Sequence, residues 1–241
     1  MSTETMQLPK ISRSLISIWT PDPEFSTSLI LLKLYPKVQS IFSGDPIVLP
    51  NVDGIPPEVP RITLQSKNQT IRFEFSLQRI NLVIQDRKDS DLDSIESIKN
   101  WSVKLLSLTL QILSIKIGRL AWVLDRYVEN QNPGEALSHH FCKDSLVNVN
   151  TGALKRTENF ELHAHKKYAI LPDLLINSWV RCQTGTLKNG HEITKVMVVQ
   201  QDLNTFAEDS ETRKFTIDQV EAFLNAASIE FDSIYNLYFP K

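Results

Sequence analysis

Alternation along two neighbouring segments most constrains this fold. Segment 70–76 (TIRFEFS) places Ile71, Phe73 and Phe75 on one side of an extended chain, and segment 80–84 (INLVI) does the same with its first, third and fifth residues. Such strands bury one side and expose the other, as in an antiparallel meander. Strand-like patterns also occupy residues 13–19, 61–66, 115–128, 158–171, 174–184 and 192–200. The Asn189-Gly190 pair between the last two segments predicts a β-hairpin.

Helical spacing predicts four helices, over residues 25–35, 92–113, 135–142 and 217–238. Pro36 is expected to end or kink the first helix. The last helix has apolar residues at steps of three and four, with Thr216 and Gln219 placed to form a capping box. Residues 44–60 contain five prolines, so we expect an irregular connector there.

The order of these elements predicts an α+β fold made of two similar halves. Each half would contain a strand, a helix, a three-stranded antiparallel meander and a long helix. The halves would be residues 1–113 and 114–241. The alternative is one continuous α+β domain without duplication, and 241 residues are enough for either arrangement.

Charge and cysteine content exclude several protein classes. The net charge of −2 argues against a dedicated nucleic-acid binder, because phosphate binding requires a basic excess. Two cysteines without a CxxC pair indicate a reducing compartment. The most apolar window, 103–124, contains three basic residues, so we expect no membrane span. The start of the chain resembles no signal peptide, and we expect a cytoplasmic protein.

Histidines and a cysteine suggest a possible metal site. His163 and His165 would share one side of a strand, and with Cys142 they form a candidate zinc-ligand set. Cys142 is also a candidate nucleophile beside a histidine base. Against both, the spacing matches no zinc motif, and adjacent His139 and His140 diverge on a helix. Surface histidines and a buried cysteine are therefore the simpler interpretation, with no cofactor and no catalytic residue.

Basic and aromatic residues suggest two further kinds of site. A basic cluster beside two aromatic residues would suit a single-stranded nucleic acid, although the overall charge argues against it. Its members are Lys155, Arg156, Lys166, Lys167 and Arg181, with Tyr168 and Trp179. Tryptophans 19, 101, 122 and 179 are candidates for the lining of an apolar pocket between the halves. The glycines are isolated, which excludes phosphate-binding loops.

Several short segments resemble a sporadically distributed, uncharacterised bacterial protein family of about this length. They are residues 55–64 (IPPEVPRITL), the strand region 73–83, residues 117–120 (IGRL) and residues 229–235 (IEFDSIY). The resemblance implies a bacterial origin and carries no activity with it.

The lack of a catalytic constellation predicts a non-catalytic binding or accessory protein of a bacterial complex. An antitoxin, an immunity protein or a subunit of an antiviral defence system would fit. We expect another protein or a second copy as partner, and no membrane or nucleic acid. Candidate partner anchors on the final helix are Phe231, Tyr235, Tyr238 and Phe239. Alternatively, these residues close the core. The two other hypotheses are a small-molecule pocket between the halves and a metal- or cysteine-dependent hydrolase.

Overall fold

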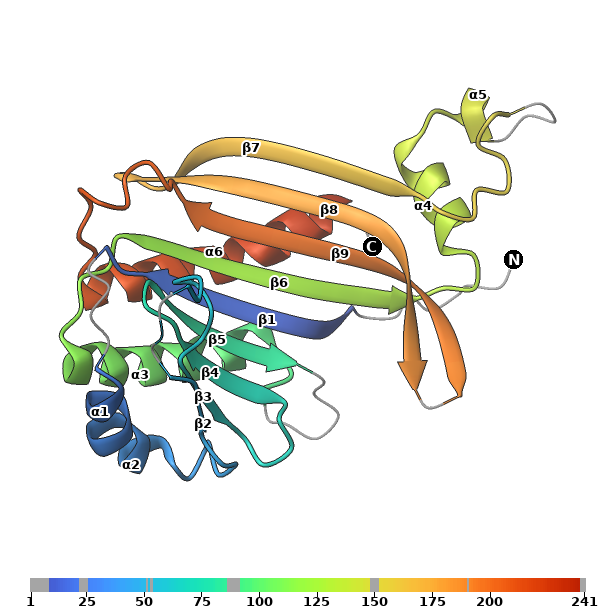
Figure 1. The fold of residues 1–241 in the computed structure, drawn as a ribbon. Helices are drawn as coiled ribbons and strands as arrows, with labels where there is room; N and C mark the ends of the chain where they lie inside the picture. The colour runs from blue at the N-terminus through green and yellow to red at the C-terminus, as the bar shows by residue number, and fades with distance from the viewer. Residues whose placement is uncertain are drawn as a thin grey trace.

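The computed structural model describes residues 9–21, 26–50, 52, 54–85, 92–147, 152–189 and 191–238. Within these ranges, nine strands form one antiparallel sheet in the order β2-β3-β4-β5-β1-β6-β9-β8-β7 (Figure 1). The strands are β1 (Lys10–Trp19), β2 (Ile47–Val48), β3 (Ile62–Gln65), β4 (Ile71–Phe75), β5 (Arg79–Gln85), β6 (Arg119–Glu129), β7 (Glu161–Leu171), β8 (Leu174–Asn189) and β9 (Glu192–Thr205).

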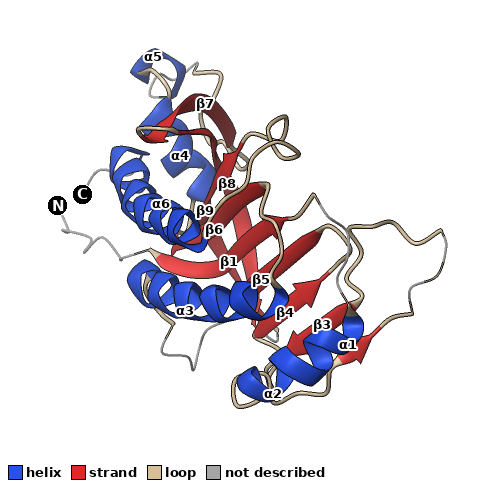
Figure 2. Cartoon of the chain, turned by 90° about the vertical axis from the view of Figure 1, so that its left-hand side faces the viewer, coloured by secondary structure: helices blue, strands red, loops and turns tan. Residues whose placement is uncertain are grey.

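The helical segments flank this sheet. They are α1 (Thr27–Leu29), the π-helical turn η1 (Ile30–Leu34), α2 (Tyr35–Val38), α3 (Ile95–Leu113), α4 (Pro133–Phe141), α5 (Asp144–Val147) and α6 (Ile217–Tyr238). The two long helices, α3 and α6, lie side by side against one face of the sheet (Figure 2). No described helix is both long and apolar enough to cross a membrane.

The core lies between the sheet and the long helices. Trp122 of β6 is fully buried there and meets Phe231 of α6 edge-on, with ring centroids 5.1 Å apart. Near the other end of the sheet, Phe73 of β4 stacks against Phe42, which follows α2. Apolar residues that alternate along each strand therefore face one continuous helix-covered layer.

The predicted fold of two similar halves is wrong. The described strands form a single sheet, because β1 pairs with β5 on one side and with β6 on the other. The helices are few and do not repeat a strand–helix–meander pattern. The helix predicted over residues 25–35 is divided into α1, η1 and α2, and the ninth strand, β2, has no place in the predicted pattern. An extended strand leaves two edges to be paired, and the order of elements along a sequence does not show which edges meet. Whether residues 1–113 and 114–241 form separate domains stays a prediction.

Most individual elements lie where the local patterns predicted them. The capping box of α6 is confirmed, since the Thr216 N–H donates to Gln219 Oε1 and the Gln219 N–H donates to Thr216 Oγ1, at 2.9 and 3.3 Å. The predicted connector at 44–60 contains β2. Pro36 does not end the helix, because it lies in the first turn of α2, where a backbone N–H is not needed. The π-helical turn η1 directly precedes α2 and accommodates the proline within the helical segment.

Candidate functional site

The face of the sheet opposite α3 and α6 has no helix over it in the part of the chain that the structure describes. We call it the open face. Alternation along the strands directs mainly polar side chains to this face, together with two tryptophans and a few aliphatic residues, and cross-strand register brings them into rows. Each row joins side chains that are direct cross-strand neighbours. The first row is Arg79–Trp19–Arg119, and the second is Glu74–Asn81–Ser17–Ala121–Asn204–Asn177–Lys167. The third row is Arg72–Val83–Leu15–Val123–Asp202–Trp179–His165, and the fourth is Gln85–Arg13–Asp125–Gln200–Arg181–His163.

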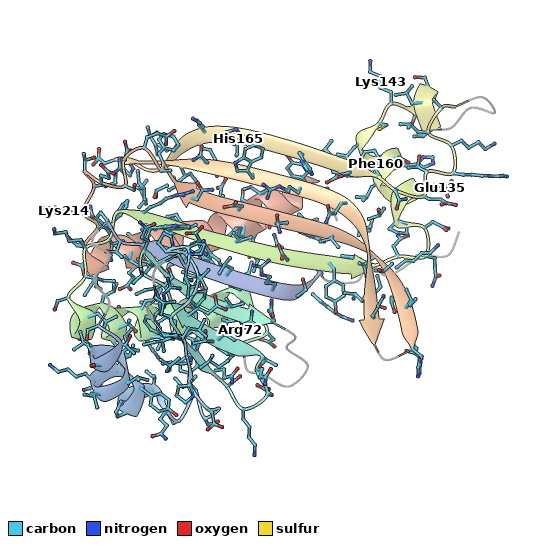
Figure 3. All side chains as sticks on the ribbon, in the orientation of Figure 1. Arg72, Glu135, Lys143, Phe160, His165 and Lys214 are labelled. Carbon is cyan, nitrogen blue, oxygen red and sulfur yellow. The ribbon has the colours of Figure 1, made fainter. Side chains whose placement is uncertain are left out.

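One stacked group lies toward the β7 edge of the open face. The His165 and Trp179 rings are almost parallel, at 11°, with centroids 4.0 Å apart. His165 Nε2 lies 3.3 Å from Asn177 Oδ1, and the Arg181 guanidinium lies 5.4 Å from the Trp179 ring. Figure 3 shows the open face from the front, with His165 labelled near one side and Arg72 near the other. These contacts hold both rings in place without burying His165, which stays exposed.

A second stacked group occupies the first row. Trp19 lies between two arginines, with the Arg119 guanidinium 4.5 Å and the Arg79 guanidinium 5.7 Å from its rings. Arg119 also donates from Nε to the Thr205 carbonyl and from Nη2 to Asn204 Oδ1, both at 3.1 Å. Burial lowers the pKa of Arg119 below its ordinary value. This row is therefore an ordered cationic group built around one indole ring.

Asp125 lies at the centre of the open face. Gln200 Nε2 donates to Asp125 Oδ1 at 2.9 Å, and Arg13 Nη1 lies 3.9 Å from its other oxygen. Burial raises the pKa of this carboxyl, although Gln200 and Arg13 oppose the shift. Arg181 Nη1 donates to Gln200 Oε1 at 2.7 Å, which extends the chain of contacts to β8. Side-chain contacts thus link strands β1, β6, β9 and β8 across the face.

The candidate metal ligands do not form a site among the described residues, and the role of Cys142 as a nucleophile stays a prediction. His163 Nε2 lies 2.6 Å from Glu161 Oε1, and His165 stacks on Trp179. Cys142 follows the end of α4 and is half-buried. No group of three or more metal-ligand side chains within the described ranges is arranged to hold a metal ion. The prediction that His163 and His165 share one side of a strand is confirmed, since they are two positions apart on β7 and both lie on the open face.

The candidate partner anchors on α6 have different environments. Phe231 is 0% exposed and packs inside the core, as the alternative interpretation expected. Tyr235 is nearly buried beneath the Arg126 guanidinium, 4.2 Å from its ring. Tyr238 is half-buried against Phe141 of α4, with centroids 5.7 Å apart. Phe239 lies outside the described residues. Partner binding by this set stays a prediction, and Phe231 is inaccessible in this conformation.

The basic cluster and the four tryptophans do not come together. Lys166 faces the helix layer, where its Nζ lies 3.6 Å from Glu230 on α6. Lys167 and Arg181 face the open side instead. Among the tryptophans, Trp122 is in the core and Trp101 lies on α3, whereas Trp19 and Trp179 are on the open face. The described residues therefore do not form a tryptophan-lined pocket between the halves.

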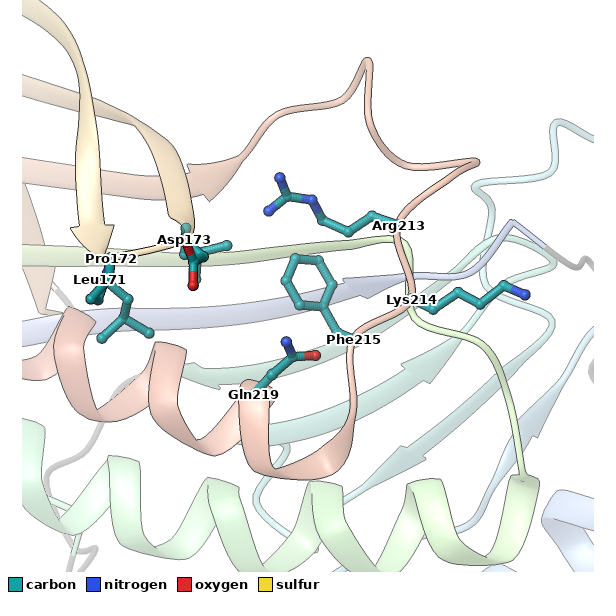
Figure 4. A pocket seen from close by; sticks show the side chains of 8 residues that line it. Leu171, Pro172, Asp173, Arg213, Lys214, Phe215 and Gln219 are labelled. Carbon is teal, nitrogen blue, oxygen red and sulfur yellow. The ribbon is translucent and has the colours of Figure 1, made fainter.

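The structure contains a cavity at the end of the β7–β8 turn. It has a volume of about 390 Å³ and lies between that turn and the start of α6 (Figure 4). Arg213, Phe215 and Asp173 face it, and Arg213 is paired with Asp209 at 3.3 Å. All of its lining residues come from 171–219, so this cavity does not lie between the predicted halves. Its size falls within the range of small-molecule sites.

Comparison with known proteins leaves the open face as the main guide to function. No protein-family model matches this chain, and no significant match exists among curated proteins. The resemblance to a bacterial family accordingly stays a prediction.

Sequence reasoning missed the open face as a site. The usable signal was the presence of Trp19 and Trp179 at positions of their strands where polar residues alternate outward. A large aromatic residue in that phase lies on the solvated side of a sheet, where tryptophan is one of the residue types enriched at binding surfaces. Which arginines lie beside each ring depends on register between distant strands, and no local pattern encodes it.

Proposed function

We propose that this protein is a non-catalytic binding protein, an accessory or inhibitory subunit of a bacterial complex, such as an antitoxin, an immunity protein or a defence-system subunit. It binds another protein through the open face of its sheet. The observation that carries the proposal is the extended order of that face: stacked rings and linked polar side chains cross its strands, and no helix of the described ranges covers them. Preorganised aromatic and arginine side chains are typical of binding hot spots.

The chemistry of the open face favours binding over catalysis. Its central carboxylate, Asp125, is held by an amide and an arginine. Its histidines are each held by a neighbouring side chain. Groups already engaged with one another suit a fixed recognition surface better.

Affinity capture from the native host tests this proposal. The tagged wild-type protein is compared with the open-face variant His165→Ser/Trp179→Ser, which removes the exposed ring stack. The matched control is Ile229→Ser on α6, because Ile229 is 73% exposed on the helix side of the molecule. We expect one co-purifying protein that the double variant loses and the control retains. Recovery of the wild-type protein alone as a monomer, or equal capture by all three proteins, would refute the proposal.

Small-molecule binding is a second candidate, favoured by the 390 Å³ cavity at the β7–β8 turn. A metabolite thermal-shift screen tests it, with Phe215→Ala as the variant that should abolish any stabilisation. No stabilising compound for the wild-type protein would dismiss this function.

A further inference from the structure

We propose that the cationic row Arg79–Trp19–Arg119 binds the carboxylates of an acidic segment of a partner protein. The proposal rests on the proposed binding function and specifies the chemistry of the partner. Register alone creates this row, since Trp19 is the direct cross-strand neighbour of Arg79 on β5 and of Arg119 on β6. One aromatic ring therefore separates two guanidinium groups on the uncovered side of the sheet.

These two arginines differ in their partners from three other arginines of the sheet; Arg181, bound to Gln200 and near the Trp179 ring, likewise has no ion pair within the described ranges. Arg13, Arg72 and Arg126 each lie within 4 Å of a carboxylate oxygen, at 3.9, 3.2 and 2.8 Å. Within the described ranges, Arg79 and Arg119 form no such ion pair. Arg119 is bound by a carbonyl and an amide, and the Arg79 Nε is buried without an acceptor. The row therefore carries two charges that the described chain leaves without a direct counter-charge.

The proximity of the two guanidinium groups has an electrostatic consequence. Burial has the largest effect on the pKa of Arg119 and lowers it, and the Arg79 charge lowers it further by less than Asp202 or Glu208 raises it. The carboxylates of Asp202 and Glu208 raise the pKa of Arg119, although neither forms an ion pair with it. Asp202 Oδ1 instead accepts a hydrogen bond from Asn204 at 2.9 Å. Carboxylates placed against the two guanidinium groups, one on each side of Trp19, would offset their repulsion and accept from the free guanidinium donors.

A carboxylate-bearing protein fits the row better than a nucleic acid. Single-stranded nucleic acids bind by stacking bases on open aromatic faces. Here Trp19 is flanked by the two arginines, and Trp179 by His165. The chain also has a net charge of −2, which opposes a polyphosphate backbone. The planar fork of a guanidinium matches a carboxylate in two parallel hydrogen bonds.

The test uses fluorescence anisotropy with the full chain and three labelled probes: a short peptide alternating glutamate and glycine, the same peptide with glutamine for glutamate, and single-stranded oligothymidylate. The variants are Arg79→Gln and Arg119→Gln. The control is Lys104→Gln, which removes an exposed positive charge from α3 on the opposite side of the sheet. Thermal unfolding of each variant verifies that it is folded, and Arg79→Lys and Arg119→Lys replace any glutamine variant that is not.

We expect the glutamate peptide to bind and the glutamine peptide not to bind. Each arginine variant should weaken the glutamate complex about tenfold, or about 1.4 kcal/mol, and the control should not change it. Raised salt should weaken binding. Absence of glutamate-peptide binding, equal binding by the arginine variants, or tighter arginine-dependent binding of oligothymidylate would each overturn the inference. If host capture still depends on His165 and Trp179 in that event, the proposed function stands and only the acidic partner is wrong.

Discussion

Arg126 joins the sheet to the C-terminal half of α6, and its removal tests how this contact stabilises the fold. The side chain is almost fully buried and donates to Asp232 Oδ1 at 2.8 Å, to Gln201 Oε1 at 2.5 Å and to the Phe231 carbonyl at 2.5 Å. Burial lowers the pKa of Arg126, and the Asp232 carboxylate opposes that shift. The arginine is thus a desolvated charge whose ion-pair partner, Asp232, is 63% exposed.

The expected cost of Arg126→Met follows from the groups left behind. Gln201 Nε2 still donates to the Phe231 carbonyl at 2.9 Å, and water can solvate Asp232. Only Gln201 Oε1 loses its donor, which costs about 1–3 kcal/mol. Methionine fills similar volume and removes the desolvation of the guanidinium, so the net loss should be about 1–2 kcal/mol. Asp232→Ala leaves the buried charge without its carboxylate and should also cost about 1–2 kcal/mol, after allowance for the exposure of Asp232.

A double-mutant cycle distinguishes this account from independent effects. The free energy of unfolding is measured by urea denaturation for the wild type, both single variants and the double variant. If Asp232 acts through Arg126, Asp232→Ala should cost almost nothing in the Arg126→Met background, giving a coupling energy of about 1–2 kcal/mol. Glu221→Ala, an exposed change on the same helix, is the control. An equal loss on Asp232→Ala in both backgrounds would refute the reasoning.

Three further predictions concern single side chains. Burial raises the pKa of the Cys182 thiol to about 12, so native alkylation should modify half-buried Cys142 and spare Cys182; fast labelling of both by mass spectrometry would contradict the buried position. Ser14→Ala should cost about 1–3 kcal/mol in urea denaturation, because Ser14 Oγ accepts the Trp122 indole N–H at 2.9 Å inside the core; no loss would contradict that hydrogen bond. Because the folded-state pKa of Asp125 is raised, its ionisation should reduce stability as pH rises from the ordinary aspartate pKa through the raised value. Asp125→Asn should therefore remove that pH dependence in melts recorded across the acidic range, and an unchanged slope would count against the shift.

The sequence predicted local elements well where neighbouring residues are sufficient to determine them. The position of α6 follows from apolar steps of three and four together with the Thr216–Gln219 capping box. Alternation likewise identified β4 and β5. In both cases the determining contacts join residues a few positions apart, so a local pattern records them.

Only the tertiary structure decided how these elements combine. The pairing of β1 with both β5 and β6 merges all the described strands into one sheet and overturns the expected pair of similar halves. The candidate site has the same origin, because Trp19 lies beside Arg119 through a register between segments a hundred positions apart. A shift of one residue in that register would turn the side chains of a strand to the opposite face. The amino-acid sequence therefore determined which residues are polar and outward, and long-range strand pairing decided which of them meet.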